Sequence, residues 1–184
     1  MRRLILLMGY SLDGHVSGPD GQPNRINVEP DEELDRWKVA PVRTASLHLM
    51  GRVTYEEMAA YWPSATSIFA GPMNEIPKAV ASATIEKADW HETTILRGDL
   101  RAEVERLKSG DGGDIIAHGG ARFVQSLARL GLIDEYRLVV YPAAAGSGRP
   151  LFGTLSEPLQ LDLISASTFP TGALGLVYRP RNST

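Results

Sequence analysis

The 184 residues, of which 43% are hydrophobic and 22% are charged, suit one soluble domain with a continuous core, and we expect that domain to span residues 1–184. The absence of cysteine excludes disulfides and thiolate metal sites, the four histidines form no i, i+4 pair for zinc, and a net charge of −3 offers no basic surface for nucleic acid. No apolar run approaches the roughly 18 residues of a membrane helix, so we expect no metal, no nucleic-acid or membrane partner, and a cytoplasmic location.

The first third of the chain alternates strand and helix patterns. Residues 3–10 (RLILLMGY) form a continuous apolar run that predicts a buried strand. The following residues 11–27 are rich in Gly, Pro and Asn and predict a long loop, and a loop of that length is usually functional or disordered. Next come a helix over 30–42 with an acidic first turn, a strand over 46–51, and a helix over 54–62 that Pro63 ends.

The rest of the chain continues this alternation and then becomes rich in strands. Between residues 78 and 131 the pattern predicts three strands (78–84, 93–98, 114–120) and two helices (99–110, 121–131), with Asp99 capping the first of these helices and Gly110 stopping it. After residue 131 it predicts strands over 134–142, 159–167 and 173–180 and a glycine-rich loop over 143–153. We therefore predict an α/β fold with a mostly parallel sheet, helices on both faces and an antiparallel C-terminal edge hairpin.

The segment LMGRVTYEEM (49–58) is a strand-to-helix turn with two interpretations. Thr54 stands where a helix N-cap is expected, and Glu57 three residues later would complete a capping box. Alternatively, the helix N-terminus, the Thr54 hydroxyl and the Arg52 guanidinium together form an anion site, because the planar fork of arginine binds phosphate well. The segment alone leaves both open.

A second turn of this kind lies in IIAHGGARFVQSL (115–127). In one interpretation Gly119 and Gly120 serve only as a tight connection, since glycine tolerates positive φ. In the other they are bare so that a phosphate can approach the backbone at the helix N-terminus. Two such turns at the carboxyl ends of parallel strands can face one crevice, which suits a dinucleotide with phosphates at more than one place.

Several segments together carry a resemblance. They are YSLDGHV, GRVTYEEMAAYWP, KAVASAT and IIAHGGARFVQSLARLGLIDEYRLVVYPAAAGSGRPLF, and they extend over almost the whole chain. In combination they resemble the dihydrofolate reductase-like superfamily, and more narrowly the bacterial proteins similar to the reductase (RibD C-terminal) domain of the bifunctional riboflavin-synthesis enzyme. The resemblance implies a dihydrofolate reductase-like three-layer fold that binds NADPH.

The resemblance also implies roles for particular residues. Arg52, preceded by Gly51, would meet the adenosine 2′-phosphate, and Thr54 with its neighbouring backbone would meet the pyrophosphate. The remaining cofactor contacts would be the backbone N–H groups of Gly119, Gly120 and Ala121 at the pyrophosphate, Ser82 at the adenosine, and Met8 and Gly9 at the nicotinamide. The family often has basic residues where this chain has Val53 and Ala83. Arg52 would therefore hold the 2′-phosphate mainly alone, and the choice between NADPH and NADH stays open.

Asp13, in SLDGH, is the candidate catalytic residue. It lies just past the first strand, beside the nicotinamide site of the resembling fold, and a carboxyl there could orient a polar ring or a water during hydride addition. We expect desolvation to raise its pKa toward working pH. Its alternative role is to hold an Asp-Gly turn through its own backbone. Asp35 and Trp37 are weaker candidates for substrate contact on the first helix.

The functional prediction is an NADPH-dependent oxidoreductase that acts on a small heterocyclic or ribosylaminopyrimidine-like substrate. The alternatives are a dihydrofolate reductase and a nucleotide-binding sensor without turnover. We also expect a homodimer. Members of the resembling family are commonly dimeric, and one domain need not cover the apolar residues of the C-terminal strands, which are Leu138, Val140, Leu174, Leu176 and Tyr178.

Overall fold

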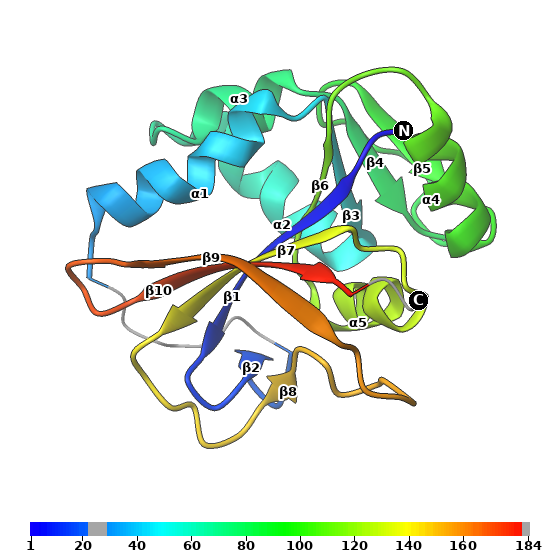
Figure 1. Ribbon diagram of the computed structural model, residues 1–184. Helices are drawn as coiled ribbons and strands as arrows, with labels where there is room; N and C mark the ends of the chain where they lie inside the picture. Colours follow the sequence, from blue (N-terminus) through cyan, green and yellow to red (C-terminus); the bar gives the residue numbers. More distant parts are fainter. Residues whose placement is uncertain (22–28, 182–184) are drawn as a thin grey trace.

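An eight-stranded sheet runs through the molecule in the order β5-β4-β3-β6-β1-β7-β10-β9 (Figure 1). The computed structural model describes residues 1–21 and 29–181, so the end of the predicted loop, residues 22–27, lies outside the described residues. The six strands from β5 to β7 are parallel, and β10 and β9 join the edge antiparallel. The strands are β1 (Leu4–Ser11), β3 (Leu47–Gly51), β4 (Lys78–Ala81), β5 (Thr93–Leu96), β6 (Ile115–Ala117), β7 (Glu135–Tyr141), β9 (Leu161–Thr168) and β10 (Leu174–Pro180).

Helices cover both faces of this sheet. One face packs against α1 (Glu32–Thr44), α2 (Arg52–Tyr61) and α3 (Ala70–Glu75), and the other against α4 (Leu100–Ser109) and α5 (Ala121–Arg129). Strand residues alternate between the two cores: Leu49 of β3 belongs to the α4–α5 core and Met50 to the α1–α3 core. The predicted fold class, a mostly parallel sheet with an antiparallel C-terminal edge hairpin and helices on both faces, is confirmed.

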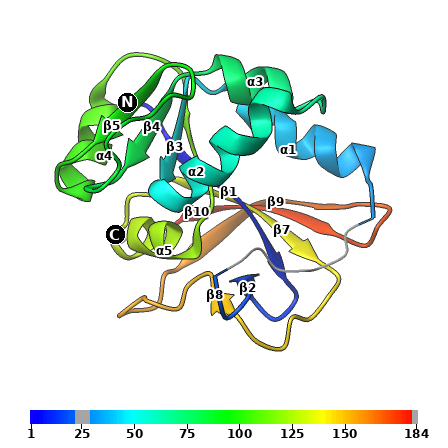
Figure 2. The same ribbon diagram turned by 180° about the vertical axis from the view of Figure 1, so that it is seen from behind.

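Short elements account for most differences from the sequence prediction. The chain also forms η1 (Trp62–Ser64), α3, and a separate two-stranded sheet of β2 (His15–Ser17) and β8 (Arg149–Pro150), none of which the pattern predicted. Figure 2 shows β2 and β8 beside the C-terminal end of β1. Elements of two to six residues carry too few apolar positions to show a period, and β2 pairs with a strand more than 130 residues away.

The starts of α1, α4 and α2 show which residues cap these helices. Asp31 caps α1 by accepting hydrogen bonds from the N–H groups of Glu33 and Leu34, and Asp99 caps α4 by accepting from Ala102 N–H as predicted. The prediction that Thr54 caps α2 is wrong. The helix begins two residues earlier, with Gly51 as its N-cap, so Thr54 and Glu57 form no capping box.

The apolar residues of the C-terminal strands are largely covered within one chain. Leu138 and Val140 are buried, so the expectation that they need a partner subunit is wrong for these two residues. Leu174 is 37% exposed, and Leu163 and Ile164 of the edge strand β9 are half-exposed. In the part of the chain that the structure describes, no helix is both long and apolar enough to cross a membrane.

A buried carboxylate links the N-terminus to strands β7 and β10. Glu135, at the start of β7, is 1% exposed and accepts hydrogen bonds from Arg3, Arg137 and Arg179 at 2.8–3.1 Å. Burial by itself raises the pKa of Glu135, but the bonds from Arg137 and Arg179 outweigh burial and lower it. Glu135 therefore stays ionised and ties the N-terminus, β7 and β10 together.

We expect Glu135→Gln to lower the free energy of unfolding by about 2 kcal/mol, because the three arginines lose the carboxylate that they all contact. The loss is moderate because their guanidinium groups are partly exposed and stay hydrated. Urea unfolding at pH 7 measures the change. Asp162→Asn breaks the exposed Arg181–Asp162 pair and serves as the control, with an expected change below about 0.5 kcal/mol. Equal effects of the two substitutions would contradict this role of Glu135.

Candidate functional site

The two strand-to-helix turns singled out in the sequence touch each other. β3 leads into α2 at Gly51, and β6 leads into α5 through His118, Gly119 and Gly120. The Thr54 hydroxyl donates a hydrogen bond of 2.6 Å to the Gly119 carbonyl oxygen. The two turns thus form one unit at the carboxyl edge of the parallel sheet, which is where open α/β sheets bind ligands.

Both helices that begin at this unit lack a side-chain cap. Among the described residues, no side chain accepts a hydrogen bond from the first-turn N–H groups of α2 or α5, whereas α1 and α4 each have an aspartate cap. The first N–H groups of a helix have no partner within the helix, and the helix dipole makes that end attractive to an anion. The two uncapped ends therefore offer backbone donors to a negatively charged ligand.

One cavity of about 540 Å³ opens onto both helix ends. Its lining brings together five of the predicted cofactor residues, which are Gly51, Arg52, Thr54, Gly120 and Ala121. A smaller cavity of about 250 Å³ is lined by a sixth, Ser82, and shares Ala81, Phe123 and Ser126 with the first. The two cavities are therefore neighbours at the ends of β3, β4 and β6, and we call the pair the groove.

Arginines concentrate around the larger cavity. Arg52 lies at the first turn of α2 and makes an ion pair with Glu56, in which Nη1 lies 3.0 Å from each carboxylate oxygen. Arg122, in the first turn of α5, and Arg149, on β8, also line this cavity, and neither forms an ion pair with another described residue. The sequence analysis missed both residues. The place of Arg122 just after the glycines could have indicated it, whereas Arg149 reaches the cavity only because β8 folds back onto β2.

The remaining predicted cofactor residues lie beside the groove. A Cβ on Gly119 would lie 3.0 Å from the Met8 sulfur, so Met8 on β1 adjoins the glycine turn. A Cβ on Gly9 would lie 2.6 Å from the Tyr141 ring, so Gly9 is bare because a tyrosine of β7 packs on it. The Ser82 hydroxyl accepts hydrogen bonds from Thr84 N–H and Ile85 N–H and so shapes the turn after β4.

Gly120 has a structural reason to be glycine in addition to any ligand. Its φ of +94° is one that L side chains rarely adopt, and a Cβ there would lie 2.6 Å from Thr54 Oγ1. Gly119 has no such φ, and its added Cβ would meet only the flexible end of Met8. The turn needs Gly120 for its shape, whereas a close approach to the backbone is the better reason for Gly119.

Two buried histidines lie beneath the glycine turn. His118 Nε2 is 2.9 Å from His48 Nδ1, and His48 Nε2 is 3.1 Å from the carbonyl oxygen of Pro72 in α3. A carbonyl can only accept, so His48 carries its proton on Nε2 and accepts from His118 through Nδ1. Burial lowers the pKa of His48 to about 4, with the charge of Lys78 adding to the effect, and burial together with His48 lowers the pKa of His118. Both rings are therefore neutral at pH 7.

The structure places Asp13 away from this groove. Its carboxylate accepts hydrogen bonds from Ala145 N–H at 2.9 Å and Gly146 N–H at 2.7 Å, and His15 Nδ1 lies 3.4 Å away. The Ser11 hydroxyl and these two amides hold the pKa of Asp13 well below its usual value. The expectation that desolvation raises this pKa is wrong, since the side chain is exposed and accepts several hydrogen bonds. Asp13 is an ionised group that fastens the β1–β2 turn to the loop before β8.

Asp35 and Trp37 also lie outside the groove. Asp35 pairs with Lys38 at 2.7 Å on the surface of α1. The Trp37 ring packs edge-on against Phe169, with ring centroids 6.1 Å apart, and it lies over Gly175 of β10. Neither residue lines the two cavities described above.

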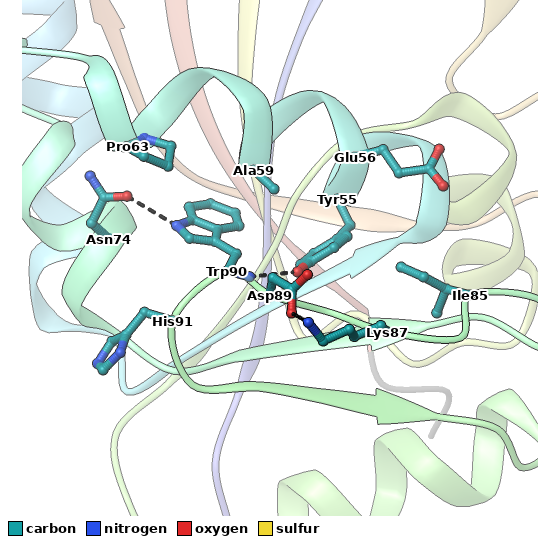
Figure 3. Close-up of a pocket in the computed structure, with 10 residues that line it drawn as sticks. All are labelled: Tyr55, Glu56, Ala59, Pro63, Asn74, Ile85, Lys87, Asp89, Trp90 and His91. Atoms are coloured by element: carbon teal, nitrogen blue, oxygen red, sulfur yellow. Dashed lines mark hydrogen bonds and ion pairs between the residues drawn. The ribbon is translucent and has the colours of Figure 1, made fainter.

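A larger cavity of about 790 Å³ lies on the other side of α2, between that helix and residues 85–91 (Figure 3). Most of its polar side chains bond to one another: Trp90 donates from Nε1 to Asn74 and from its backbone N–H to the Tyr55 hydroxyl, and Lys87 pairs with Asp89. Glu56, which also lines this cavity, pairs with Arg52. These bonds hold residues 85–91 against α2 and α3. We therefore assign this cavity a structural origin and place the candidate site in the groove of Arg52.

The groove can hold a phosphorylated ligand through backbone N–H groups and arginine side chains. Thr54 can take part only through its backbone or by accepting, because its one hydroxyl hydrogen already bonds to Gly119. Among the described residues, no three His, Cys, Asp or Glu side chains are grouped as a metal site would require.

Comparisons with known proteins agree with this geometry. Residues 2–174 match the model of the RibD C-terminal domain family. Uncharacterized protein YyaP of Bacillus subtilis (strain 168) is 28% identical over 191 residues, which cover 96% of this chain and 94% of the relative.

Solved structures share the fold. A proposed riboflavin biosynthesis protein from Shewanella sp. PV-4 superposes with a TM-score of 0.80 at 20% identity, covering 99% of this chain and all of that one. The diaminohydroxyphosphoribosylaminopyrimidine deaminase/5-amino-6-(5-phosphoribosylamino)uracil reductase of Thermotoga maritima gives 0.69 at 16% identity, covering 98% of this chain and 57% of that one. Dihydrofolate reductase from Enterococcus faecalis, complexed with NADP(H), gives 0.66 at 13% identity, covering 98% and 97%. The predicted dihydrofolate reductase-like fold is confirmed.

The histidine pair generates a prediction about pH. Each ring is neutral in the folded protein and protonates near pH 6.5 in the unfolded chain, so stability is lost as the pH falls below that value. With a folded pKa of about 4, His48 alone should cost about 2 kcal/mol between pH 7 and pH 5. Urea unfolding of His48→Gln at both pH values should therefore show a correspondingly smaller loss than the wild type.

His91→Gln is the control, because the His91 side chain is 62% exposed and should leave the loss unchanged. Carboxylates that also titrate are present in every variant and cancel in the comparison. An identical loss in wild type and His48→Gln would show that His48 does not resist protonation.

Proposed function

The chain belongs to the RibD C-terminal domain family, and we propose that it is an NADPH-dependent reductase that transfers a hydride to a small heterocyclic or ribosylaminopyrimidine-like substrate. The observation that carries the proposal is the pair of uncapped helix N-termini that share one arginine-lined cavity. A dinucleotide carries a pyrophosphate and, in NADPH, a separate 2′-phosphate, and the groove offers donors at more than one place.

Different parts of the cofactor would contact different residues of the groove. The backbone N–H groups at the starts of α2 and α5 would take the pyrophosphate, with Arg122 and Arg149 nearby. Arg52 would take the 2′-phosphate, and the small cavity around Ser82 would take the adenosine end. Met8, which adjoins Gly119 on β1, would wall the nicotinamide, where the bound cofactor supplies the hydride.

Asp13 keeps a proposed role on the substrate side, but as a positioning residue. An ionised carboxylate that accepts two amide hydrogens is a poor proton donor, and it fixes the β1–β2 turn relative to the loop before β8. The proton that follows hydride transfer would then come from water or from the substrate's own surroundings.

Of the alternatives, the position of Asp35 weakens the case for a dihydrofolate reductase. Folate reductases place an acidic residue of the corresponding helix toward the substrate, whereas Asp35 pairs with Lys38 at the surface. A nucleotide-binding sensor would use the same groove without turnover, and NADPH oxidation with candidate substrates separates it from a reductase.

We also propose that the protein forms a homodimer in the cytoplasm. The partly exposed apolar residues Leu163, Ile164 and Leu174 lie on the β9–β10 hairpin at the edge of the sheet. An edge strand with exposed apolar side chains is a natural place for a second copy to pack.

The test of the cofactor proposal is Arg52→Ala. Loss of a charge-assisted contact to the 2′-phosphate should weaken NADPH by about 10- to 100-fold, which corresponds to about 1.5–3 kcal/mol, and should change NADH affinity much less. Calorimetric titration of both cofactors measures the difference. Equal weakening of NADPH and NADH would place the 2′-phosphate elsewhere.

Asp13→Asn tests the positioning role. An asparagine places an NH₂ group against one of the two amides that Asp13 now accepts from, so the turn loses its anchor. We expect kcat to fall by about 10- to 100-fold, as for a small misplacement of a reacting group, with unchanged NADPH affinity and an unchanged shape of the pH–rate profile. Asp89→Asn, which breaks an exposed pair with Lys87, is the control. A pH–rate profile that loses one limb would instead identify Asp13 as an acid or base.

A further inference from the structure

One helical turn of α2 carries both kinds of charged residue by which proteins discriminate between NAD and NADP. Arg52 and Glu56 lie four residues apart, and Arg52 Nη1 contacts both carboxylate oxygens at 3.0 Å. Dinucleotide sites generally use an acidic residue to accept from the ribose 2′-hydroxyl of NAD, or an arginine to bind the 2′-phosphate of NADP. Here the two kinds of residue are paired with each other.

We propose that Glu56 determines cofactor specificity, by neutralising Arg52 and so reducing the preference for a 2′-phosphate. The inference rests on the proposed function, because it assumes that Arg52 faces the adenosine ribose. Glu56 lines the cavity on the other side of α2 and not the groove itself, so it would act through its ion pair with Arg52 and through its negative charge, which would repel the 2′-phosphate of NADPH.

The geometry of the pair supports this competition. One nitrogen of Arg52 serves both oxygens of Glu56, which leaves Nε and Nη2 available to a phosphate. A phosphate bound there shares one guanidinium with the carboxylate, so the two anions lie within about 8 Å of each other. At about 6 Å in water a carboxylate and a phosphate dianion repel enough to change affinity by roughly three- to tenfold.

The residues near Arg52 add no further positive charge for the 2′-phosphate. Val53, next to Arg52, is 54% exposed and uncharged, and Ala83 in the adjoining cavity is uncharged as well. The other arginines of the groove come from α5 and β8, where the pyrophosphate is proposed to lie. At the α2 end of the groove Glu57 also lines the cavity, so Arg52 is the one basic side chain that α2 contributes there, and pairing with Glu56 reduces its attraction for a phosphate.

The experiment measures binding of NADPH and NADH to wild type and Glu56→Gln by calorimetry. Glutamine keeps the length of the side chain and removes its charge. We expect NADPH to bind three- to tenfold more tightly and NADH to bind equally or more weakly, with the gain shrinking as salt is raised. Adenosine 2′,5′-bisphosphate and 5′-AMP, used as fragments, should show the same change in ratio without any turnover.

Glu105→Gln is the matched control, since Arg101 and Glu105 form an ion pair of the same order, spacing and exposure on α4. It should leave both affinities unchanged. The double substitution Arg52→Gln/Glu56→Gln should lose the gain in NADPH affinity, because no guanidinium remains at position 52 to bind the 2′-phosphate.

The outcomes separate this inference from the proposed function. An unchanged or lower NADPH-to-NADH preference in Glu56→Gln overturns the role of Glu56, even if both cofactors bind. Glu57 lines the groove but does not pair with Arg52, so an equal gain in Glu57→Gln shows a general charge effect and also overturns the role of Glu56. A wild-type protein that binds neither cofactor nor the bisphosphate overturns the proposed function itself.

Discussion

The hydrogen bond from the Thr54 hydroxyl to the Gly119 carbonyl is the constraint on which the candidate site depends. It holds two strand-to-helix turns together, so that the free N–H groups of α2 and α5 open into one cavity. Thr54 lies in the first turn of α2, where Gly51 is the N-cap, so its side chain is placed to bond across to the second turn and not to cap its own helix. Backbone N–H groups that a cap would otherwise satisfy are left for a ligand.

Polar groups in the adjacent core support this arrangement from below. Two carbonyl oxygens of α3 accept hydrogen bonds from buried side chains: Pro72, which also accepts from Ile76 N–H, accepts from His48, and Asn74 accepts from Lys78. His48 in turn accepts from His118, which immediately precedes the glycine turn. His48, His118 and Lys78 thus each have a hydrogen-bond partner, which is the condition for placing two histidines and a lysine in a core. A short helix that appears peripheral is in this way connected to the site.

The large elements were predictable because each has enough residues to show its period. The alternation of strand and helix patterns predicted a mostly parallel sheet with helices on both faces, but not the order of its strands, and Asp99 caps its helix as its position indicates. The site residues of the two turns were found through their resemblance and spacing, and five of them line one cavity. The sequence analysis failed where a side chain had a choice of partners. Thr54 could cap α2 or bond across to Gly119, and Asp13 could be desolvated or could accept amides from a loop about 130 residues away. Such choices depend on contacts that no local pattern contains.

The charge distribution of the groove depends on which charged residues are neighbours on one helix and which come from segments far apart in the sequence. Arg52 meets Glu56 because both lie on one face of α2, four residues apart, and any isolated helix with this sequence would bring them together. Arg122 and Arg149 come from separate segments and meet only in the folded chain, in a cavity that Asp20 and Glu57 also line. Arg52 is paired with Glu56, whereas Arg122 forms no ion pair with another described residue, so the unpaired positive charge of the two helix starts lies at α5 and not at α2. An anion would be drawn first to the glycine turn, and the pair on α2 would act afterwards, on whatever group the ligand presents there.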